Sequence, residues 1–264
     1  MQRSEYWPAY TWEIQTSYSK DIESKISSEL KISKEDFRTM YFNIFHKINA
    51  SFYHLQRLKK NQETAIKIGQ AMAKIKIPGT ESMIGIASVP YEPIEYEYET
   101  LLGTIKSTLD FISILVASGF GRKEDNILIL LNNIKFLKLK KGSLEKKVYT
   151  FLKNDQFTDL FESFRNPSKD LKSKRNFATH KGPLPIGTIN IPINNPSASI
   201  LLVKAIDPND PNPHSSLLNS ADLVKYCENQ FYQTCDLLIG ILSILVKKQL
   251  RPGQKVSVYE QKLV

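Results

Sequence analysis

Apolar side chains recur every three or four residues over much of this 264-residue chain, and no other feature limits the possible folds as strongly. The clearest stripe comprises Phe37, Met40, Tyr41, Ile44, Phe45, Ile48, Phe52, Leu55 and Leu58. This spacing puts all of these side chains on one side of an α-helix. Ser33, followed three residues later by Asp36, forms a capping box that marks the start of the helix. We therefore predict a long amphipathic helix from residue 33 to about residue 76.

The rest of the chain is also predominantly helical in pattern, with one exception near the carboxyl end. Similar spacing predicts helices over residues 19–30, 95–118, 125–139, 144–164 and 220–250. Residues 188–193 and 197–206 are instead rich in β-branched side chains and are separated by a turn sequence, which predicts a hairpin. We predict an all-α bundle with a small β-hairpin insertion, at about residues 187–207, before the last long helix.

The loops rich in proline and glycine suggest a division of the chain into three parts. Residues 1–93 are predicted to form an N-terminal helical extension that packs on the core. Residues 94–250 are predicted to form the helical core domain, including the hairpin insertion. Residues 251–264 are predicted to be a short tail after the last helix.

The charge of the chain favours a polyanionic partner. The sequence has 36 lysines and arginines against 27 acidic residues, for a net charge of +9. Such an excess suits nucleic acid or anionic lipid, although many lysine-rich soluble proteins bind neither. Lysine supplies most of the excess, and it is spread along the chain instead of being collected in one tail.

The two cysteines and the apolar runs indicate a cytoplasmic protein. Cys227 and Cys235 are eight residues apart in one predicted helix, about 12 Å along its axis. That distance exceeds the roughly 7 Å between Cα atoms that a disulfide tolerates, and free thiols suit a reducing compartment. The N-terminus has no apolar signal-peptide core, and the longest apolar run, residues 237–246, is too short to span a bilayer. We expect no membrane partner.

Several familiar kinds of site are missing from the sequence. There is no glycine loop for phosphate after a strand, no zinc-type spacing of cysteine and histidine, and no His-Glu-x-x-His motif. We therefore expect no metal and no cofactor. Four glutamates at the start of one predicted helix are interpreted as a solvated first turn that complements the helix dipole: Glu92, Glu95, Glu97 and Glu99. His46 and His54 are interpreted as ordinary surface or packing residues, and His214 as a solvated loop residue.

The stretch RNFATH, residues 175–180, is the strongest candidate for a functional site. At 100° per residue, a helix puts four polar side chains on one side: Arg175, Asn176, Thr179 and His180. Phe177 and Ala178 fall on the opposite side, toward a core. Asn176 and His180 are four residues apart, close enough for the amide to orient the imidazole. Gly182 and Pro183 then end the helix, which leaves the histidine near an open end.

These residue types suit cleavage of RNA without a metal ion. Ribose carries its own nucleophile, the 2′-hydroxyl group. A histidine can remove its proton or protonate the leaving 5′-oxygen, and an arginine can stabilise the charge on the phosphate oxygens. Two copies of one histidine, facing each other in a dimer, can divide the roles of acid and base. Lys172, Lys174 and Lys181 are candidates for phosphate or RNA contacts.

The same six residues resemble the Arg-polar-x-x-x-His signature of the HEPN superfamily, in its form with Asn after Arg. The resemblance implies a helical bundle that dimerises so that two motifs meet in one cleft. It also implies metal-independent endoribonuclease activity, commonly in toxin–antitoxin or antiphage systems, with a possible antitoxin or regulatory protein as partner. Arg175 and His180 would then be catalytic, with Asn176 and Thr179 in support. The hairpin and the long N-terminal helices are additions to the minimal domain of that family.

Two other functions remain compatible with the sequence. The helical module could bind RNA, a nucleotide or a protein without catalysis, with the RNFATH face as its contact surface. Alternatively, the chain could be a structural helical protein in which the Arg-His pair is accidental. RNA cleavage in EDTA distinguishes the first hypothesis from both alternatives.

Overall fold

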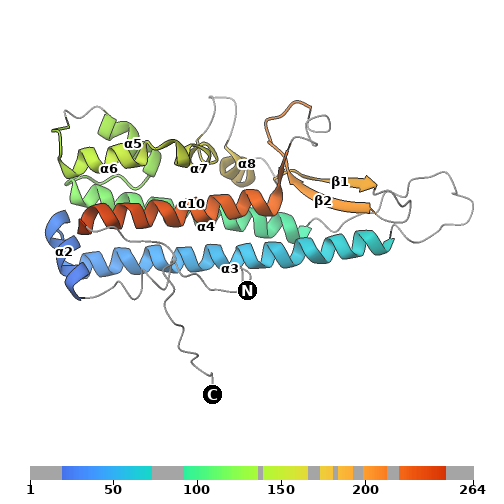
Figure 1. Cartoon of the computed structure of the whole chain (residues 1–264), viewed down its shortest axis with the longest axis horizontal. Helices are drawn as coiled ribbons and strands as arrows, with labels where there is room; N and C mark the ends of the chain where they lie inside the picture. The colour runs from blue at the N-terminus through green and yellow to red at the C-terminus, as the bar shows by residue number, and fades with distance from the viewer. Residues whose placement is uncertain are drawn as a thin grey trace, which may run out of the picture. The chain divides into compact units, whose positions relative to one another are not determined.

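The computed structural model describes residues 20–72, 92–135, 139–165, 173–180, 184–192, 199–212 and 220–247. Helices dominate these residues, and the strands belong to one small sheet (Figure 1). This confirms the predicted all-α fold with a small hairpin insertion before the last long helix. The α-helices are α2 (Lys20–Leu30), α3 (Lys34–Met72), α4 (Glu92–Gly119), α5 (Ile127–Lys135), α6 (Leu144–Leu152), α7 (Thr158–Glu162), α8 (Lys174–His180) and α10 (Leu223–Val246).

Helix α3 begins where the capping box predicts. The backbone N–H of Asp36 donates to Ser33 Oγ at 2.9 Å, and the Ser33 hydroxyl donates to Asp36 Oδ2 at 2.6 Å. The predicted apolar stripe is largely buried, with Phe37 and Leu55 at 0% exposure. Residues 73–76, where this helix was predicted to end, lie outside the described residues.

The helix predicted over residues 144–164 is wrong in one respect, because it is interrupted after Leu152. A 3-10 turn, η2 (Asp155–Phe157), separates α6 from α7. The Asn154 side chain accepts a hydrogen bond from the backbone N–H of Gln156 at 3.0 Å and so starts the new turn. Asparagine competes with helical hydrogen bonding in this way, which is why it favours caps over helix interiors.

The strands form a sheet in the order β1-β2-β3. Strand β1 (Ile186–Pro192) pairs antiparallel with β2 (Ser199–Ala205), with Ile186 opposite Ala205. Strand β3 (Ala221–Asp222) pairs antiparallel with β2. These two residues were predicted to belong to the last helix. That helix begins only at Leu223, where Asp222 Oδ1 accepts the backbone N–H of Lys225 at 3.0 Å.

The chain divides into two compact units, and each unit draws on distant parts of the sequence. The first unit comprises Met1–Asn49, Ser107–Thr158 and Tyr232–Val264, and the second comprises Ala50–Lys106 and Asp159–Phe231. Helices α3, α4 and α10 each contribute to both units. The domain boundary predicted at residue 93 remains a prediction. Each of the two compact units takes residues from both sides of residue 93.

The first unit contains a close approach between two helices. An added Cβ atom at Gly240, on α10, would overlap the ring of Phe151, on α6. The Phe151 ring also meets buried Phe157 edge to face, with 5.2 Å between ring centroids. The absence of a side chain at Gly240 is therefore what lets α6 pack directly on α10.

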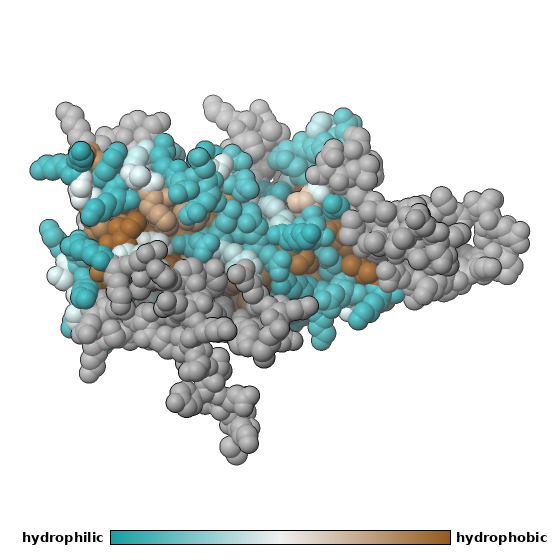
Figure 2. Space-filling model, in the orientation of Figure 1, coloured by the Kyte–Doolittle hydropathy of each residue, from teal (hydrophilic) through white to brown (hydrophobic). Residues whose placement is uncertain are grey.

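The core of the second unit joins α3, α4, α7 and α10. Its fully buried side chains include Leu55, Leu58, Ile94, Tyr98, Leu101, Leu160 and Leu223. The rings of Phe52 and Phe231 lie 5.8 Å apart, and Lys59 Nζ lies 2.6 Å from Glu228 Oε1, so α3 and α10 are joined by apolar and ionic contacts. On the face drawn in Figure 2, hydrophilic side chains cover most of the described helices, with apolar patches between them. The helices thus turn their apolar sides largely inward, as their spacing predicts.

Candidate functional site

The RNFATH sequence lies on helix α8, in the second unit, as the sequence predicts. Ser173 is 3% exposed and starts the helix. Its Oγ accepts the backbone N–H of Asn176 at 3.3 Å, and its carbonyl accepts the N–H of Phe177 at 2.8 Å. A serine before the first helical residue satisfies N–H groups that have no partner within the helix.

Arg175 and Asn176 are brought together, but through a contact that the sequence reasoning did not anticipate. Arg175 Nη1 donates a hydrogen bond to Asn176 Oδ1 at 3.1 Å, and both side chains are partly exposed. The amide oxygen therefore orients the guanidinium group. Thr179 and His180 belong to α8 by their backbone, and their side chains lie outside the described part of the structure. The predicted contact between Asn176 and His180 remains a prediction.

Lys174 packs against the protein. Its Nζ lies 4.0 Å from the centroid of the Tyr226 ring, on α10. Burial lowers the pKa of Lys174, and the nearby Asp207 offsets part of that effect. The other two lysines predicted as RNA contacts, Lys172 and Lys181, lie outside the described residues. Of the three lysines predicted to contact RNA, the structure thus describes only Lys174, and this lysine contacts an aromatic ring of the protein.

Tyr226 connects α8 with two other helical segments. Its hydroxyl shares a 2.7 Å hydrogen bond with Ser163 Oγ, just after α7, and its ring meets Tyr98 of α4 edge to face at 6.2 Å. Burial raises the pKa of Tyr226, although the bond to Ser163 opposes the shift. The adjacent Cys227 is fully buried, and burial raises the pKa of its thiol. Both cysteines are free, as predicted.

The chain that follows α8 is held by α4. Glu99 Oε1 accepts the backbone N–H of Leu184 at 2.9 Å, and the Leu184 side chain is fully buried. The chain is therefore anchored on both sides of α8: by buried Ser173 before the helix, and by Leu184, which is bonded to α4, after it. This arrangement limits how far the RNFATH segment can shift relative to the rest of the second unit.

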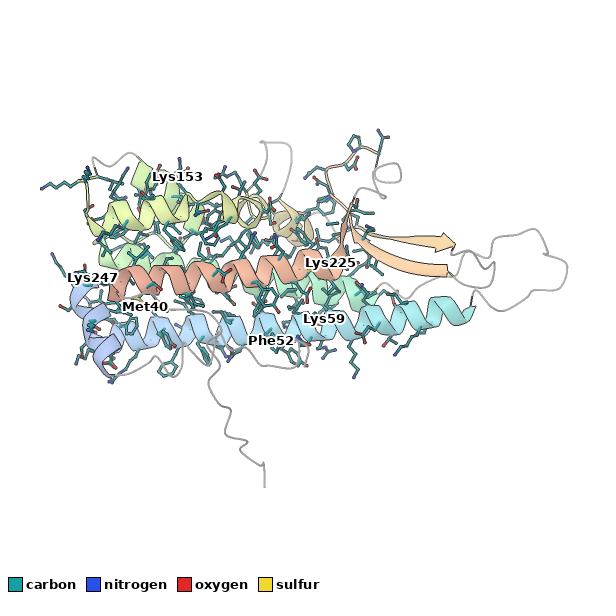
Figure 3. All side chains as sticks on the ribbon, viewed as in Figure 1. Met40, Phe52, Lys59, Lys153, Lys225 and Lys247 are labelled. Carbon is teal, nitrogen blue, oxygen red and sulfur yellow. The ribbon has the colours of Figure 1, made fainter. Side chains whose placement is uncertain are left out.

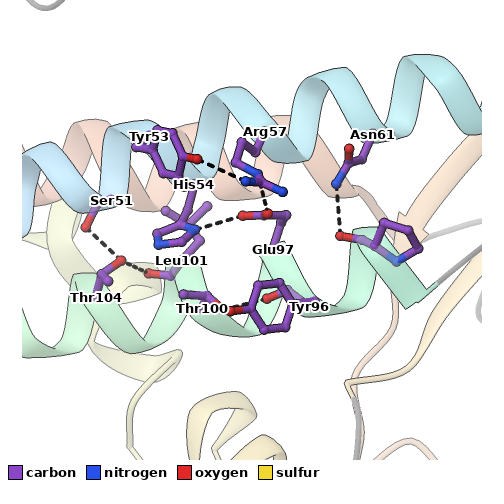
Figure 4. A network of polar contacts seen from close by, with 11 residues as sticks. Ser51, Tyr53, His54, Arg57, Asn61, Tyr96, Glu97, Thr100, Leu101 and Thr104 are labelled. Atoms are coloured by element: carbon purple, nitrogen blue, oxygen red, sulfur yellow. Dashed lines mark hydrogen bonds and ion pairs between the residues drawn. The ribbon is translucent and has the colours of Figure 1, made fainter.

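A second polar cluster, which the sequence reasoning missed, joins α3 and α4 in the same unit (Figure 4). Glu97 is 1% exposed, yet its Oε2 lies 2.7 Å from His54 Nδ1 and its Oε1 lies 2.6 Å from Arg57 Nε. Arg57 Nη1 also donates to the Tyr53 hydroxyl at 2.9 Å, and its guanidinium group lies over the Tyr53 ring. The hydrogen bond and the Glu97 charge raise the pKa of Arg57.

The predicted solvated turn is therefore wrong for Glu97, and His54 is more than an ordinary packing residue. The sequence held one signal that points to the burial of Glu97. It occupies the apolar spacing of α4, between buried Ile94 and buried Leu101. Its partners, His54 and Arg57, are more than 35 residues away, so their identity could not be read from that spacing. Glu92, by contrast, is exposed as predicted.

Among the described residues, no group of three or more His, Cys, Asp or Glu side chains is arranged to hold a metal ion.

Helix α4 is long and apolar enough to cross a bilayer, by length and composition alone, but 56% of its most apolar window is buried inside the protein. The buried core helices of soluble proteins satisfy the same criteria.

Comparison of the chain with models of protein families, with curated proteins and with solved structures finds no match in any of the three.

Proposed function

We propose that this protein is a metal-independent endoribonuclease of the HEPN type, acting as a homodimer. Arg175 and His180 are its catalytic residues, and Asn176 and Thr179 support them. The proposal rests on the resemblance of RNFATH to the signature of that superfamily and on the all-α fold in which the motif is found. The net charge of +9 adds the positive field that an RNA substrate favours.

One observation carries the proposal furthest. Arg175 is partly exposed, and its guanidinium group is oriented by the Asn176 amide, on a helix whose start is capped by buried Ser173. An oriented arginine can hold a phosphate through two parallel hydrogen bonds and stabilise the charge that develops on it. Asparagine directly after arginine thus has a physical role in the motif, as an acceptor that fixes the guanidinium plane.

The proposed reaction balances without a metal ion. The 2′-oxygen attacks phosphorus, the bond from phosphorus to the 5′-oxygen breaks, and a 2′,3′-cyclic phosphate and a 5′-hydroxyl group result. His180 of one subunit accepts the proton of the 2′-hydroxyl group. His180 of the partner subunit donates a proton to the leaving 5′-oxygen. Because the reaction needs one histidine in each protonation state, we expect a bell-shaped dependence of rate on pH.

The decisive experiment measures cleavage of single-stranded RNA in EDTA by the wild type and by His180→Ala. We expect cleavage by the wild type and a loss of about 100-fold or more in the variant, the usual contribution of acid–base catalysis. His46→Ala is the matched control. Because His46 is exposed on α3, this variant should cleave RNA like the wild type. No cleavage of any RNA by folded wild-type protein would rule the proposal out, as would a strictly monomeric protein in sedimentation at micromolar concentration.

A non-catalytic binding module is the second candidate. It is favoured by the internal engagement of Lys174 with Tyr226, because this lysine then serves the fold. RNA binding that is unchanged in Arg175→Ala and His180→Ala, together with no cleavage by the wild type, would support this candidate.

A further inference from the structure

One internal segment of the first unit is strongly basic because it contains almost no acidic residues. Residues 126–154 contain seven lysines, no arginine and a single acidic residue, Glu145, for a net charge of +6. The whole chain has a net charge of +9, so these 29 residues supply two thirds of it. The segment includes α5, α6 and the turn between them.

Five of these lysines are exposed, and we call this set the lysine patch: Lys140, Lys141, Lys146, Lys147 and Lys153. Among the described residues, none of the five forms an ion pair with a carboxylate. Arg38, Arg57 and Arg122, by contrast, each pair with a glutamate. The charge of the lysine patch is therefore not compensated within the described structure.

An aromatic ring lies between two members of the lysine patch. Tyr149, on α6, has Lys146 three residues before it and Lys153 four residues after it, which puts all three on one side of the helix. Lys146 Nζ lies 5.8 Å and Lys153 Nζ lies 5.5 Å from the centroid of the Tyr149 ring. Lys153 is labelled beside α6 in Figure 3. Contacts of this kind are weak at exposed sites, so each ammonium group can leave the ring for a phosphate.

We propose that the lysine patch, with Tyr149 between Lys146 and Lys153, is a docking surface for single-stranded RNA. The choice of RNA as the partner rests on the proposed function. Uncompensated lysines gain affinity for a phosphate backbone by releasing the counterions that surround it. An aromatic ring among cations offers a surface on which an unpaired base can stack, the combination that binds single strands without sequence preference.

An anionic membrane fits the patch less well. A helix that lies in a membrane interface presents large apolar side chains next to its cations. In α6, Val148 and Leu152 are buried, and none of its large apolar side chains is among the exposed ones. The helix can therefore offer a membrane its charge but no apolar face.

The test measures binding of a 2′-O-methyl oligoribonucleotide of about 20 nucleotides by fluorescence anisotropy. The blocked 2′-oxygen prevents the proposed cleavage, so binding is read independently of activity. The probe variant carries glutamine at all five lysines of the patch. The matched control carries the same charge change at five exposed lysines outside it: Lys25, Lys34, Lys60, Lys67 and Lys225. Both sets are on the surface, and equal thermal unfolding confirms that the variants are folded.

We expect the patch variant to bind about tenfold or more weakly at 100 mM salt, whereas the control stays within about twofold of the wild type. The slope of log affinity against log salt should fall by about 0.7 for each lysine that contacts a phosphate. Tyr149→Ala should weaken binding by about five- to a hundredfold, and Tyr149→Phe should restore it, because stacking needs the ring. Equal losses in the patch and control variants, or wild-type protein that binds phosphatidylserine vesicles but not the oligonucleotide, would overturn the inference.

The two proposals can fail separately. Binding through the lysine patch without any RNA cleavage would leave the docking surface and remove the nuclease. Cleavage that depends on His180, combined with oligonucleotide binding that is unaffected by the five substitutions, would leave the nuclease and remove the docking surface.

Discussion

Glu97 is the most deeply buried acidic side chain that the structure describes, and each of its carboxylate oxygens has its own partner. A buried carboxylate is stable only where hydrogen bonds and opposite charge replace the water that it has lost. His54 and Arg57 supply both, and Arg57 remains half-exposed, so the cluster keeps one side toward solvent. The cluster therefore acts as a polar clamp between α3 and α4 inside an apolar interface.

Replacing Glu97 with glutamine should destabilise the protein by about 1–3 kcal/mol. The amide is neutral and cannot accept from both His54 and Arg57 with the strength of a carboxylate. Urea denaturation measures the change, with Glu63→Gln as the control, because Glu63 is exposed on α3. A loss no larger than in the control would mean that the clamp contributes nothing to stability.

Glu95, two residues before Glu97, makes stability depend on pH. Partial burial raises the pKa of Glu95, and Glu99 and Glu92 raise it further. The folded state thus holds this proton more tightly than the unfolded state, so stability falls as the pH rises through the raised pKa. The variant Glu95→Gln has no such proton. Its urea midpoint relative to the wild type should therefore be higher at pH 7 than at pH 4, and the opposite order would contradict the assignment.

At the scale of elements, α8 is a short helix that depends on its neighbours for its position. Short helices are marginal on their own, because too few hydrogen bonds offset the cost of nucleation. The contact of Lys174 with the Tyr226 ring and the cap from Ser173 fix α8 on the second unit. Tyr226 is in turn held by Ser163, so the position of Arg175 depends on α10 and on the residue that follows α7.

A double-mutant cycle between Lys174→Met and Tyr226→Leu tests this attachment. Because Lys174 is partly buried against the ring, we expect a coupling of about 1 kcal/mol in the free energy of unfolding. Tyr226→Phe retains the ring and loses only the bond to Ser163, so it should keep the coupling with Lys174. Strictly additive losses would show that the contact does not hold α8 in place.

At the scale of the whole molecule, three long helices run through both compact units. Because α10 continues from one unit to the other, fraying of one unit removes helical hydrogen bonds next to the other. We therefore expect the two units to unfold together, although each has its own buried side chains. The cysteines report on this directly: Cys227 belongs to the second unit and Cys235 to the first, and both are fully buried.

Neither thiol should react with a thiol reagent at pH 8 in the native protein, because burial raises the pKa of both and excludes the reagent. With Cys227→Ala and Cys235→Ala variants, each thiol can be followed alone in increasing urea. We expect the two to become reactive at the same urea concentration after correction for the stability of each variant. Two separate midpoints would show that the units unfold independently.

The sequence by itself determined the local features of this protein. The spacing of Phe37, Ile44 and Leu55 predicts α3, Ser33 and Asp36 mark its start, and the β-branched run before the last helix predicts the hairpin. The position of Arg175 on a helix was likewise predictable. These features depend on residues close together in the chain, for which backbone geometry and side-chain periodicity are sufficient.

Only the tertiary structure decided which polar side chains are solvated and which are buried. Glu97 meets His54, 43 residues away, and Lys174 lies against the ring of Tyr226, on a different helix. Strand β3 exists because β2 offers it a pairing edge, where local spacing alone favoured a longer helix. In each case the free energy of a polar side chain or backbone group depends on a partner from a distant part of the chain. The spacing of neighbouring residues does not identify that partner.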